Sequence, residues 1–324
     1  MPEFRTDLRE CRAVQVTVVM TTCNGRRFVA EALQSVFGQT HSDWRLVVVD
    51  DGSTDGTPEV VSSRVAGDSR VHVEVLPFNQ GTGASSQKAL EMATTDWCLR
   101  MSQDDVLLPE CLEMQLKVLE ANPGARVVSG RGIYINEAGR ALGRTAVTRL
   151  SNQELERRVS ESKPIGLLDP GTLLHRPTVL GAGGYRREFS GVEDCDLWGR
   201  LAERRVPIVT HAGVVVRYRL HAQSISSGGG QRSAFLGEWV AACMRARRVA
   251  VVEPSRAEFQ RLWDARPAWK KVLMWREYTS RALYRQAGQM ALDGAWARSA
   301  IALGAAALLA PGYVARRLVA QLVR

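Results

Sequence analysis

Two adjacent carboxylates follow a predicted strand in the stretch Met101-Ser102-Gln103-Asp104-Asp105-Val106-Leu107-Leu108-Pro109-Glu110. The strand runs from Trp97 to Met101, and a helix is predicted from Leu108 to Ala121. Pro109 suits the first turn of that helix, where a missing N–H would be unpaired anyway. At the carboxyl edge of an α/β sheet, a pair such as Asp104 and Asp105 points into the crevice where ligands bind.

Two interpretations of Asp104 and Asp105 are open at this point. Neighbouring carboxylates repel each other unless a cation lies beside them, and a divalent, oxygen-binding metal that carries a phosphorylated substrate would supply that cation. Alternatively, one of the two side chains caps the helix that begins near Leu108. The rest of the chain has to distinguish the metal site from the cap.

The composition of the chain is that of a soluble globular protein. It has 324 residues, of which 45% are hydrophobic and 24% charged, enough for one large or two ordinary domains. Residues 1–12 include Glu3, Asp7 and Glu10, so we expect no signal peptide. The cysteines form no C-x-x-C pair and no zinc spacing, which favours reduced thiols in a cytoplasmic protein.

The formal net charge of +9 is concentrated in the last quarter of the chain. From Ala241 to Arg324 there are 15 Lys and Arg against 5 Asp and Glu, whereas the first 240 residues carry 28 against 29. This distribution favours a local anionic partner, such as peripheral contact with the inner face of a membrane. We expect no nucleic-acid partner, because the chain contains no recognisable nucleic-acid-binding module.

Strands and helices alternate through the first 110 residues or so. Buried strands are predicted at Val14–Met20 and Leu46–Asp50 and an alternating strand at Val71–Leu76, with helices between them and the Trp97 strand after them. This alternation predicts an α/β fold with a Rossmann-like, mostly parallel central sheet flanked by helices.

The pattern changes after the acidic stretch. A helix with a Ser-x-x-Glu capping box is predicted at Ser151–Ser160, a short helix at Glu193–Leu201, and strands at 127–128, 133–135 and 206–220. We expect one domain over residues 1–228, with halves at about 13–110 and 111–228, and a helical, basic region over 229–324. The apolar run Ser299–Leu309 falls short of the roughly 20 residues that a membrane-spanning helix needs. It is either an interfacial or an ordinary packed helix.

Acidic side chains recur at predicted strand ends and loops of this sheet, and a histidine follows late in the chain: Asp51, Asp104, Asp105, Glu193, Asp194 and His221. Carboxylates and an imidazole suit a Mn²⁺ or Mg²⁺ site that also binds phosphate oxygens. A separate carboxylate can then serve as a general base. These groups are the ones needed to transfer a group from a nucleoside diphosphate.

From Val14 to about Ser226 the sequence resembles glycosyltransferase family 2, whose members are inverting enzymes with the GT-A fold. The resemblance rests on four blocks in order: Val-Val-Met-Thr-Thr-Cys-Asn-Gly with Asp-Asp-Gly-Ser-Thr-Asp-Gly-Thr; Gln-Asp-Asp-Val-Leu-Leu-Pro-Glu; Glu-Asp-Cys-Asp-Leu-Trp-Gly-Arg-Leu; and Arg-Tyr-Arg-Leu-His. The resemblance makes residues 13–110 the nucleotide-binding half and residues 111–228 the acceptor half.

The resemblance implies a role for each matching donor-site residue. Thr21, Cys23 and Asn24 would line the nucleobase and ribose pocket, and Asp51 would accept from the base ring N–H, which favours UDP or dTDP. Three further donor-binding positions are implied. Gly81 would begin a helix that closes over the nucleotide, and Gln103 and Asp104 would lie beside the metal.

The resemblance also implies the metal and catalytic residues. Asp105 would bind the metal directly, with His221 as a late metal or diphosphate ligand. Asp194 would be the general base, and Glu193 would orient the acceptor. The implied reaction is inverting transfer of a sugar from a nucleoside diphosphate to a hydroxyl of a glycan or lipid-linked acceptor, with Mn²⁺ or Mg²⁺ as cofactor.

Other interpretations remain for the chain and for single residues. A catalytically inactive nucleotide- or membrane-binding scaffold of the same fold is the main alternative. A dehydrogenase would need G-x-G-x-x-G after the first strand, and a nucleotidyltransferase a Gly-rich basic loop there; both are absent. Asp51 could only shape its turn, Asp194 could cap a helix, and His221 could be an ordinary hydrogen-bonded histidine.

Overall fold

The computed structural model describes residues 14–145, 150–221, 230–292 and 294–322, and the chain divides into two compact units. The first unit is Met1–Tyr134 with Arg144–Arg219, and the second is Ile135–Gly143 with Leu220–Arg324. The predicted domain boundary near residue 228 lies outside the described residues. That boundary, and the division of the first domain into two halves, stay predictions.

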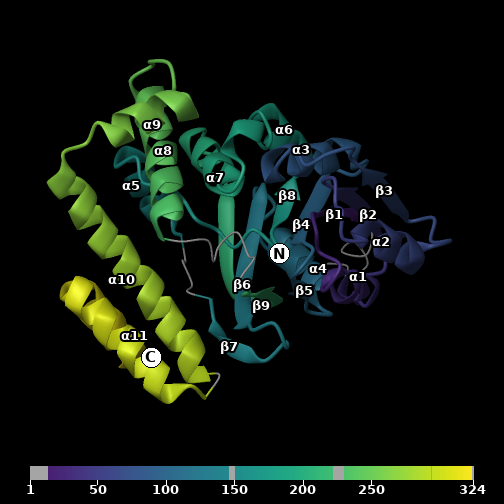
Figure 1. Cartoon of the computed structure of the whole chain (residues 1–324). Helices are drawn as coiled ribbons and strands as arrows, with labels where there is room; N and C mark the ends of the chain where they lie inside the picture. Colours follow the sequence, from purple (N-terminus) through teal and green to yellow (C-terminus); the bar gives the residue numbers. More distant parts are fainter. Residues whose placement is uncertain (1–13, 146–149, 222–229, 293, 323–324) are drawn as a thin grey trace, which may run out of the picture. The chain divides into compact units, whose positions relative to one another are not determined.

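The described residues form a sheet of nine strands in the order β3-β2-β1-β4-β8-β6-β9-β5, with β7 paired to β6 (Figure 1). The strands are β1 Val16–Thr22, β2 Trp44–Asp50, β3 Val71–Val75, β4 Trp97–Ser102, β5 Val106–Leu107, β6 Val127–Ile135, β7 Ala141–Arg144, β8 Leu173–His175 and β9 Ile208–Arg219.

The four strands predicted from the first part of the chain pair in parallel, as β3-β2-β1-β4. In the register Val16 lies opposite both Trp44 and Trp97, so the carboxyl ends of β1, β2 and β4 meet at one edge. Beyond β4 the sheet becomes antiparallel, through β8 and then β6. The predicted α/β fold with a mostly parallel sheet is confirmed.

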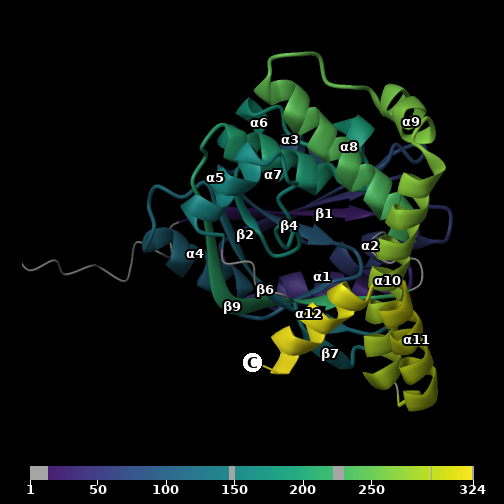
Figure 2. The ribbon, with the colours of Figure 1, turned by 90° about the vertical axis from the view of Figure 1, so that its left-hand side faces the viewer.

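Alternate residues of each strand face two separate cores. Val18 and Met20 belong to a cluster with the apolar faces of α1 (Val29–Phe37) and α4 (Cys111–Glu120), while Val19 belongs to another. The second cluster packs under α3 (Thr82–Met92), α6 (Arg176–Gly181) and α7 (Glu193–Glu203). Figures 1 and 2 show these two groups of helices on opposite faces of the sheet.

Two predicted boundaries are wrong. The helix expected from Leu108 begins at Cys111 with Glu110 as its N-cap, because Val106 and Leu107 form β5 and pair with β9. The two short strands expected within residues 127–135 form one strand, β6. Of the predicted capping box, the Ser151 half is confirmed, because its side chain accepts from the Glu154 amide (3.1 Å) at the start of α5 (Asn152–Ser160). The Glu154 carboxylate instead accepts from Arg157 and Arg158. The first unit also holds α2 (Thr57–Val65) and a 3₁₀ turn, Arg187–Phe189.

The described residues of the second unit from Gly230 onward are mostly helical, as predicted for the C-terminal region. Its helices are α8 Gly230–Arg248, α9 Arg256–Asp264, α10 Ala268–Leu292, α11 Trp296–Leu309 and α12 Pro311–Leu322. Two hydrogen bonds show that helices α10 and α11 run antiparallel. Ser280 donates to the Ala306 carbonyl and Ser299 donates to the Ala287 carbonyl, both at 2.7 Å. Among the described residues no helix is long and apolar enough to cross a membrane.

Candidate active site

The predicted donor residues come together at the carboxyl ends of β1, β2 and β4. The Thr22 hydroxyl donates to Asp50 Oδ1 (2.7 Å), and the Asp51 amide donates to the Thr22 carbonyl (2.7 Å). Ser53 completes the turn after β2 by donating from its amide to Asp50 Oδ2 (2.8 Å). These bonds join the ends of the two strands, so the loops that follow them start from fixed positions.

Gln103 holds the loop after β1 against the acidic turn after β4. Its Oε1 accepts from the Cys23 amide (2.6 Å), and its Nε2 donates to the Cys23 carbonyl (3.0 Å). This paired arrangement uses both ends of the side-chain amide and therefore fixes its orientation. A Cβ at Gly25 would meet the amide end of the Gln103 side chain, so a larger residue there would displace Gln103 from these two bonds. The structure thus gives Gln103 a positioning role that the sequence did not indicate.

Cys23 and Asn24 belong to the loop after β1. Asn79 Nδ2 donates to Cys23 Sγ (3.0 Å), and Asn24 Oδ1 accepts from the Thr54 amide (2.9 Å). Asn24 has a φ of +50°, a left-handed conformation that asparagine tolerates better than most residues. Burial raises the pKa of the Cys23 thiol, so this cysteine stays protonated near neutral pH.

Asp51 fixes the start of α3. It is 2% exposed, and its two oxygens accept from the backbone amides of Gln80 (2.7 Å) and Gly81 (2.9 Å). Gly81 has a φ of +94°, a conformation that favours glycine, and a Cβ there would also meet the Ser190 side chain. A carboxylate oxygen has a second lone pair, so these bonds leave Asp51 able to accept from a nucleobase as well.

The structure does not support the helix-cap interpretation of Asp104 and Asp105. Both residues precede β5, and Glu110 rather than either aspartate is the N-cap of α4. The β5–β9 register, with Val106 opposite Arg217, instead brings Arg219 of β9 alongside the two aspartates. The Arg219 amide donates to Asp105 Oδ1 (2.9 Å), and its Nε donates to the Asp104 carbonyl (2.9 Å).

Arg219 connects this acidic turn to helix α1. Its side chain is 1% exposed, and its Nη2 donates to Glu31 Oε2 (2.6 Å) while the guanidinium lies 4.7 Å from the centre of the Phe28 ring. Asp105 is 2% exposed, and burial, then the charge of Asp104, raises the pKa of its carboxyl well above the usual range. A buried carboxylate beside another is favourable as an anion only when a cation is near.

A buried ion pair lies next to this turn. Arg100, on β4 and 4% exposed, is 3.4 Å from Asp169 (Nε to Oδ2). Its Nη2 also donates to Thr21 Oγ1 (3.0 Å) and Ser86 Oγ (2.9 Å). Asp169 reaches Arg100 because β8 runs antiparallel to β4, which pairs Leu99 with Leu173. Neither Arg100 nor Asp169 is among the residues predicted from the sequence, although an arginine inside a predicted buried strand signals a buried partner.

Asp194 lies in the first turn of α7. The N-cap of that helix is Val192, so Asp194 does not cap it. Burial, followed by the charges of Asp169 and Glu193, raises the pKa of the Asp194 carboxyl to about 7. Burial raises the pKa of Asp169 to about 6, with Arg100 opposing the shift and the charge of Glu193 adding to it. A carboxyl that titrates near neutral pH can accept a proton efficiently under physiological conditions.

Hydrogen bonds hold Glu193 against the start of α3. Its Oε2 accepts from the Thr82 hydroxyl (2.8 Å) and from the Gly191 amide (2.7 Å). Asp51 fixes the residues just before Thr82, so α3 connects the donor loops to the predicted catalytic carboxylates. All predicted site residues but His221 belong to the first unit.

A buried ion cluster anchors the same end of α7. Asp196 is fully buried, and its Oδ2 accepts from Arg186 Nε and from Arg200 Nε, each at 2.9 Å. Arg200 Nη2 in turn donates to the Gly184 carbonyl (2.6 Å), which fixes the corner before Tyr185. Asp196 therefore holds the turn that carries Glu193 and Asp194, a role that no sequence motif indicates.

The donor set of the acidic turn suits a hard divalent cation. It offers the carboxylate oxygens of Asp104 and of the buried Asp105, and burial and the charge of Asp104 raise the pKa of the Asp105 carboxyl while Arg219 opposes them. Among the described residues no group of three or more His, Cys, Asp or Glu could hold a metal. Mg²⁺ typically binds through one or two carboxylates, with substrate phosphates and water completing its shell. His221 belongs to the second unit, and its role as a ligand stays a prediction.

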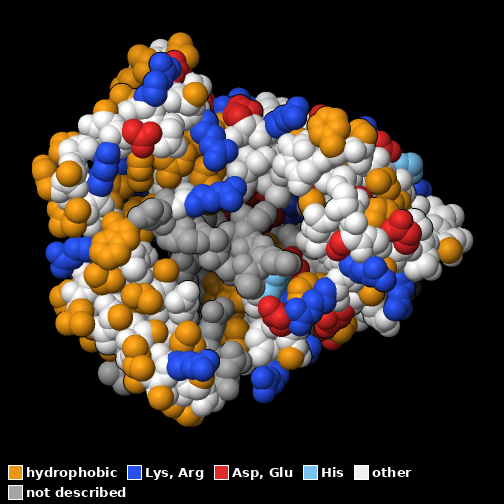
Figure 3. Space-filling view, viewed as in Figure 1, with side chains coloured by type: hydrophobic (Ala, Val, Ile, Leu, Met, Phe, Trp, Pro, Cys, Tyr) orange, Lys and Arg blue, Asp and Glu red, His pale blue; other side chains and the backbone are white. Residues whose placement is uncertain are grey.

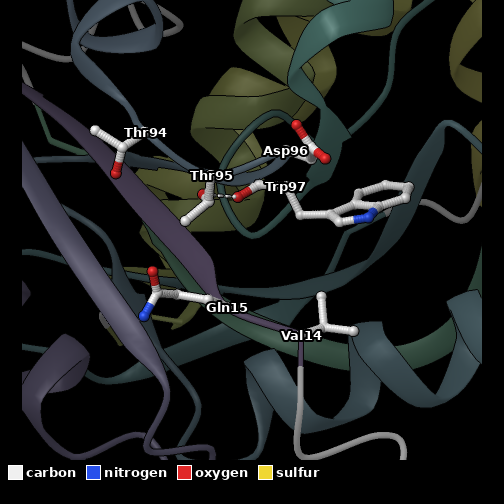
Figure 4. A pocket seen from close by; sticks show the side chains of 6 residues that line it. All are labelled: Val14, Gln15, Thr94, Thr95, Asp96 and Trp97. Carbon is white, nitrogen blue, oxygen red and sulfur yellow. Dashed lines mark hydrogen bonds between the residues drawn. The ribbon is translucent and has the colours of Figure 1, made fainter.

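A cavity of about 420 Å³ lies at the opposite edge of the sheet (Figure 4). Its lining comes from the residues before β1 and β4, and in Figure 4 the Thr95 hydroxyl donates to the Trp97 carbonyl (2.8 Å). The lining residues are Val14, Gln15, Thr94, Thr95, Asp96 and Trp97. The cavity is thus at the amino ends of these strands, away from the acidic turn at the carboxyl end of β4.

Known proteins match this chain in sequence. The family model "Glycosyl transferase family 2" matches residues 17–178, half of the chain. The "Putative glycosyltransferase EpsE" of Bacillus subtilis (strain 168) is 30% identical over 200 residues, which cover 58% of this chain and 67% of the relative. The match includes the loops after β1 and β2 and the acidic turn.

Solved structures match the fold. TarS of S. aureus (residues 1–349), in complex with UDP-GlcNAc, has a TM-score of 0.56 at 15% identity, covering 90% of this chain and 91% of that one. Mannosyltransferase PcManGT from Pyrobaculum calidifontis, in complex with GDP-Man and Mn²⁺, has a TM-score of 0.54 at 19% identity, covering 92% and 87%. At these identities the likeness concerns the fold alone.

Proposed function

The chain belongs to glycosyltransferase family 2, with the GT-A fold, and is a glycosyltransferase that uses a nucleotide-sugar donor. From that premise we propose that it transfers the sugar of a UDP- or dTDP-sugar to a hydroxyl of a glycan or lipid-linked acceptor. The transfer inverts the anomeric carbon, is assisted by a divalent metal and uses Asp194 as the base. The free cysteines of the described residues support a cytoplasmic location for this chemistry.

The observation that carries this proposal is the cluster of carboxylates at one edge of the sheet. Asp105 is buried beside Asp104, and the half-buried Asp194 lies close enough to Asp169 and Glu193 for their charges to raise its pKa. Carboxylates held this close together repel one another unless a cation binds beside them or one of them takes up a proton. One carboxylate pair suits a metal that holds the diphosphate, and the other group supplies a base.

The donor pocket is assigned to the loops after β1 and β2. Asp51 accepts from the base ring N–H, which uracil and thymine both present, and the loop of Thr21, Cys23 and Asn24 lies beside the base and ribose. UDP-GlcNAc in TarS supports a uridine donor. GDP-Man in PcManGT makes GDP the alternative to test.

The acidic turn is assigned to the diphosphate. Asp105 would hold Mn²⁺ or Mg²⁺, supported by the ion in PcManGT, and Asp104 would contact the ribose or a water molecule. When bound, the metal neutralises charge on the departing diphosphate. Arg219 keeps both aspartates in place through its bonds to Asp105 Oδ1 and the Asp104 carbonyl. Gln103 joins this turn to the nucleoside pocket.

The transfer is a single in-line displacement. The acceptor oxygen forms a bond to C1 of the sugar while the bond from C1 to the phosphate oxygen breaks, and its electron pair leaves with the nucleoside diphosphate. Asp194 takes the proton of the acceptor hydroxyl, and Glu193, held by Thr82 and the Gly191 amide, orients that hydroxyl. The raised pKa of Asp194 favours this proton transfer near neutral pH.

Isothermal titration calorimetry with UDP, dTDP, GDP and CDP, each with and without Mn²⁺, tests the donor site. We expect UDP or dTDP to bind in a Mn²⁺-dependent way, and Asp105→Asn to remove that dependence. Glu110→Gln, an exposed neighbour outside the site, is the matched control and should bind like the wild type.

The outcomes of the titration are distinct. Preference for GDP would overturn the donor assignment and leave the transferase intact. Mn²⁺-dependent binding that survives in Asp105→Asn would overturn the metal assignment. If no nucleotide bound, the donor site itself would be wrong. Binding without any release of nucleoside diphosphate from a nucleotide sugar would favour the inactive-scaffold alternative.

A further inference from the structure

Helix α11 exposes an apolar stripe on the side away from its packing partner. Its buried stripe contains Ser299, Ala302 and Ala306, and Ser299 contacts α10 through the Ala287 carbonyl. Ile301 (73% exposed) and Leu308 (83% exposed) lie roughly opposite this stripe at helical spacing. No charged residue occurs from Ser299 to Leu309. A helix that is apolar on all sides is normally covered on all sides.

The amino-terminal half of α10 shows a similar excess of exposed apolar side chains. Its exposed side chains include two tryptophans, Trp269 (60%) and Trp275 (45%), together with Val272 and Leu273. Trp269 and Leu273 are four residues apart, and Ser280 follows seven residues after Leu273, so the three share one face of the helix. Ser280 on that face packs on α11 through the Ala306 carbonyl, whereas Trp269 and Leu273 are exposed.

Cations surround these apolar side chains. From Ala268 to Arg324 the sequence has nine Lys and Arg against two Asp and Glu. Lys270, Lys271 and Arg276 are exposed on α10, Arg298 on α11, and Arg316 on α12. Figure 3 shows hydrophobic side chains gathered over α10 and α11 with Lys and Arg among them.

We propose that the exposed faces of α10 and α11 bind the surface of an anionic lipid bilayer, with the helices lying in the plane of the interface. Tryptophan prefers the headgroup level of a bilayer, and lysine can extend its charge to the headgroups while its stem lies on apolar surface. With 14 residues, α11 is about 21 Å long at 1.5 Å per residue, too short to span the bilayer but suited to lie on it.

A second copy of this chain is the competing occupant. Two such surfaces facing each other would bring their cations together, and like charges at an interface are unfavourable. An anionic bilayer offers apolar cover and the opposite charge at once. The inference goes beyond the proposed function, because it concerns no residue of the donor or catalytic site.

Flotation of the full chain with vesicles tests the proposal. Vesicles of phosphatidylcholine mixed with phosphatidylglycerol should bind the chain, and vesicles of phosphatidylcholine alone should bind it much less. The double variant Lys270→Gln/Lys271→Gln should bind roughly 25-fold more weakly, at about fivefold for each charge near the surface. Arg64→Gln/Lys163→Gln removes the same charge from exposed positions of the first unit and should bind as the wild type does.

The apolar contribution is tested by Ile301→Ser/Leu308→Ser, which replaces exposed side chains and should fold normally. This variant should lose vesicle binding, and Val252→Ser, 93% exposed outside both helices, should keep it. The proposal would be overturned if the wild type did not bind the anionic vesicles. It would also be overturned if Lys270→Gln/Lys271→Gln and Ile301→Ser/Leu308→Ser both bound them as the wild type does. A lipid-free dimer in sedimentation velocity that Ile301→Ser/Leu308→Ser dissociates would instead assign the surface to a second copy. We expect all these variants to bind nucleotide with the wild-type affinity in calorimetry. A failure of the membrane proposal can therefore be told apart from a failure of the donor-site proposal.

Discussion

The two units of this protein place charge and apolar surface in opposite ways. The first unit buries charged side chains, with Arg100 4%, Asp105 2% and Arg219 1% exposed. The second unit exposes large apolar ones, with Trp296 70% and Leu308 83% exposed. Neither arrangement is favourable for an isolated domain, because buried charge loses hydration and exposed apolar surface orders water. Such features are typical of sites and surfaces that bind a ligand or a partner.

The difference also indicates what kind of contact each unit makes. In the first unit every buried charge named above has a fixed partner, such as Asp169 beside Arg100 or the Arg219 amide beside Asp105. Fixed polar groups can orient a small, charged substrate. The exposed side chains of α10 and α11 follow helical faces, which suits a broad surface such as a bilayer. Variants of matched type in the two units can test this contrast.

The largest effect on stability is expected at Asp196. Asp196→Ala leaves Arg186 and Arg200 without their buried carboxylate, which should lower the free energy of unfolding of the first unit by about 3–5 kcal/mol. Urea denaturation, read together with hydrogen exchange of the α7 amides, measures the loss. A change below about 1 kcal/mol would contradict the anchoring role of this cluster.

Arg219→Lys should weaken nucleotide binding while the fold persists. Lysine keeps the charge but lacks the planar group that reaches both the Asp104 carbonyl and Glu31, so the acidic turn is held less firmly. We expect roughly 10–100-fold weaker Mn²⁺-dependent binding of the nucleotide in calorimetry. Arg45→Lys, exposed on β2, is the control. Unchanged affinity in Arg219→Lys would show that Arg219 does not position the aspartates.

Asp169→Asn should shift the pH dependence of the reaction. Asp194 must be ionised to act as a base, so kcat should fall as the pH decreases through its pKa of about 7. The groups that perturb Asp194 are Asp169, Glu193 and Cys195. Removing the Asp169 charge lowers the pKa of Asp194, so the acid limb should move to lower pH, by about one unit. An unmoved acid limb in the pH profile of kcat would exclude this electrostatic role.

The smallest effect is expected at an exposed ion pair of the second unit. Glu277 and Arg281 pair on α10, with 52% and 44% of their side chains exposed. Glu277→Ala should change the free energy of unfolding by no more than about 0.5 kcal/mol, because water screens this pair. Denaturation under the conditions used for Asp196→Ala provides the direct comparison. A loss as large as that of Asp196→Ala would remove the contrast between the units.

Local patterns predicted much of the first unit. The apolar runs around Val18, Val48 and Leu99 are the buried parallel strands, and Ser151 caps its helix as the Ser-x-x-Glu spacing indicates. The resemblance of four short blocks identified the family, which the match over residues 17–178 confirms. The loops of Thr21, Cys23 and Asp51 followed from the parallel order, because parallel strands end at a common edge.

Long-range pairing explains what was missed. The helix begins at Cys111 rather than at Leu108 because Val106 and Leu107, just before it, pair with β9, more than 100 residues later. Asp169 meets Arg100, and Arg219 meets Asp105, through antiparallel registers that no local pattern encodes. The charge of Arg100 inside an apolar run was the one signal that could have been used. The predicted roles of Thr21, Cys23, Asn24, Gly81 and the other site residues stay predictions.

The most direct test of the central claim is the turnover of Asp194→Asn. The measurement is the release of nucleoside diphosphate, with water as acceptor, from the nucleotide sugar whose nucleotide binds most tightly. The variant should release it about 10²–10⁴-fold more slowly than the wild type, and its affinity for the nucleotide should be unchanged. Release at the wild-type rate by Asp194→Asn would contradict the assignment of the base and the mechanism built on it.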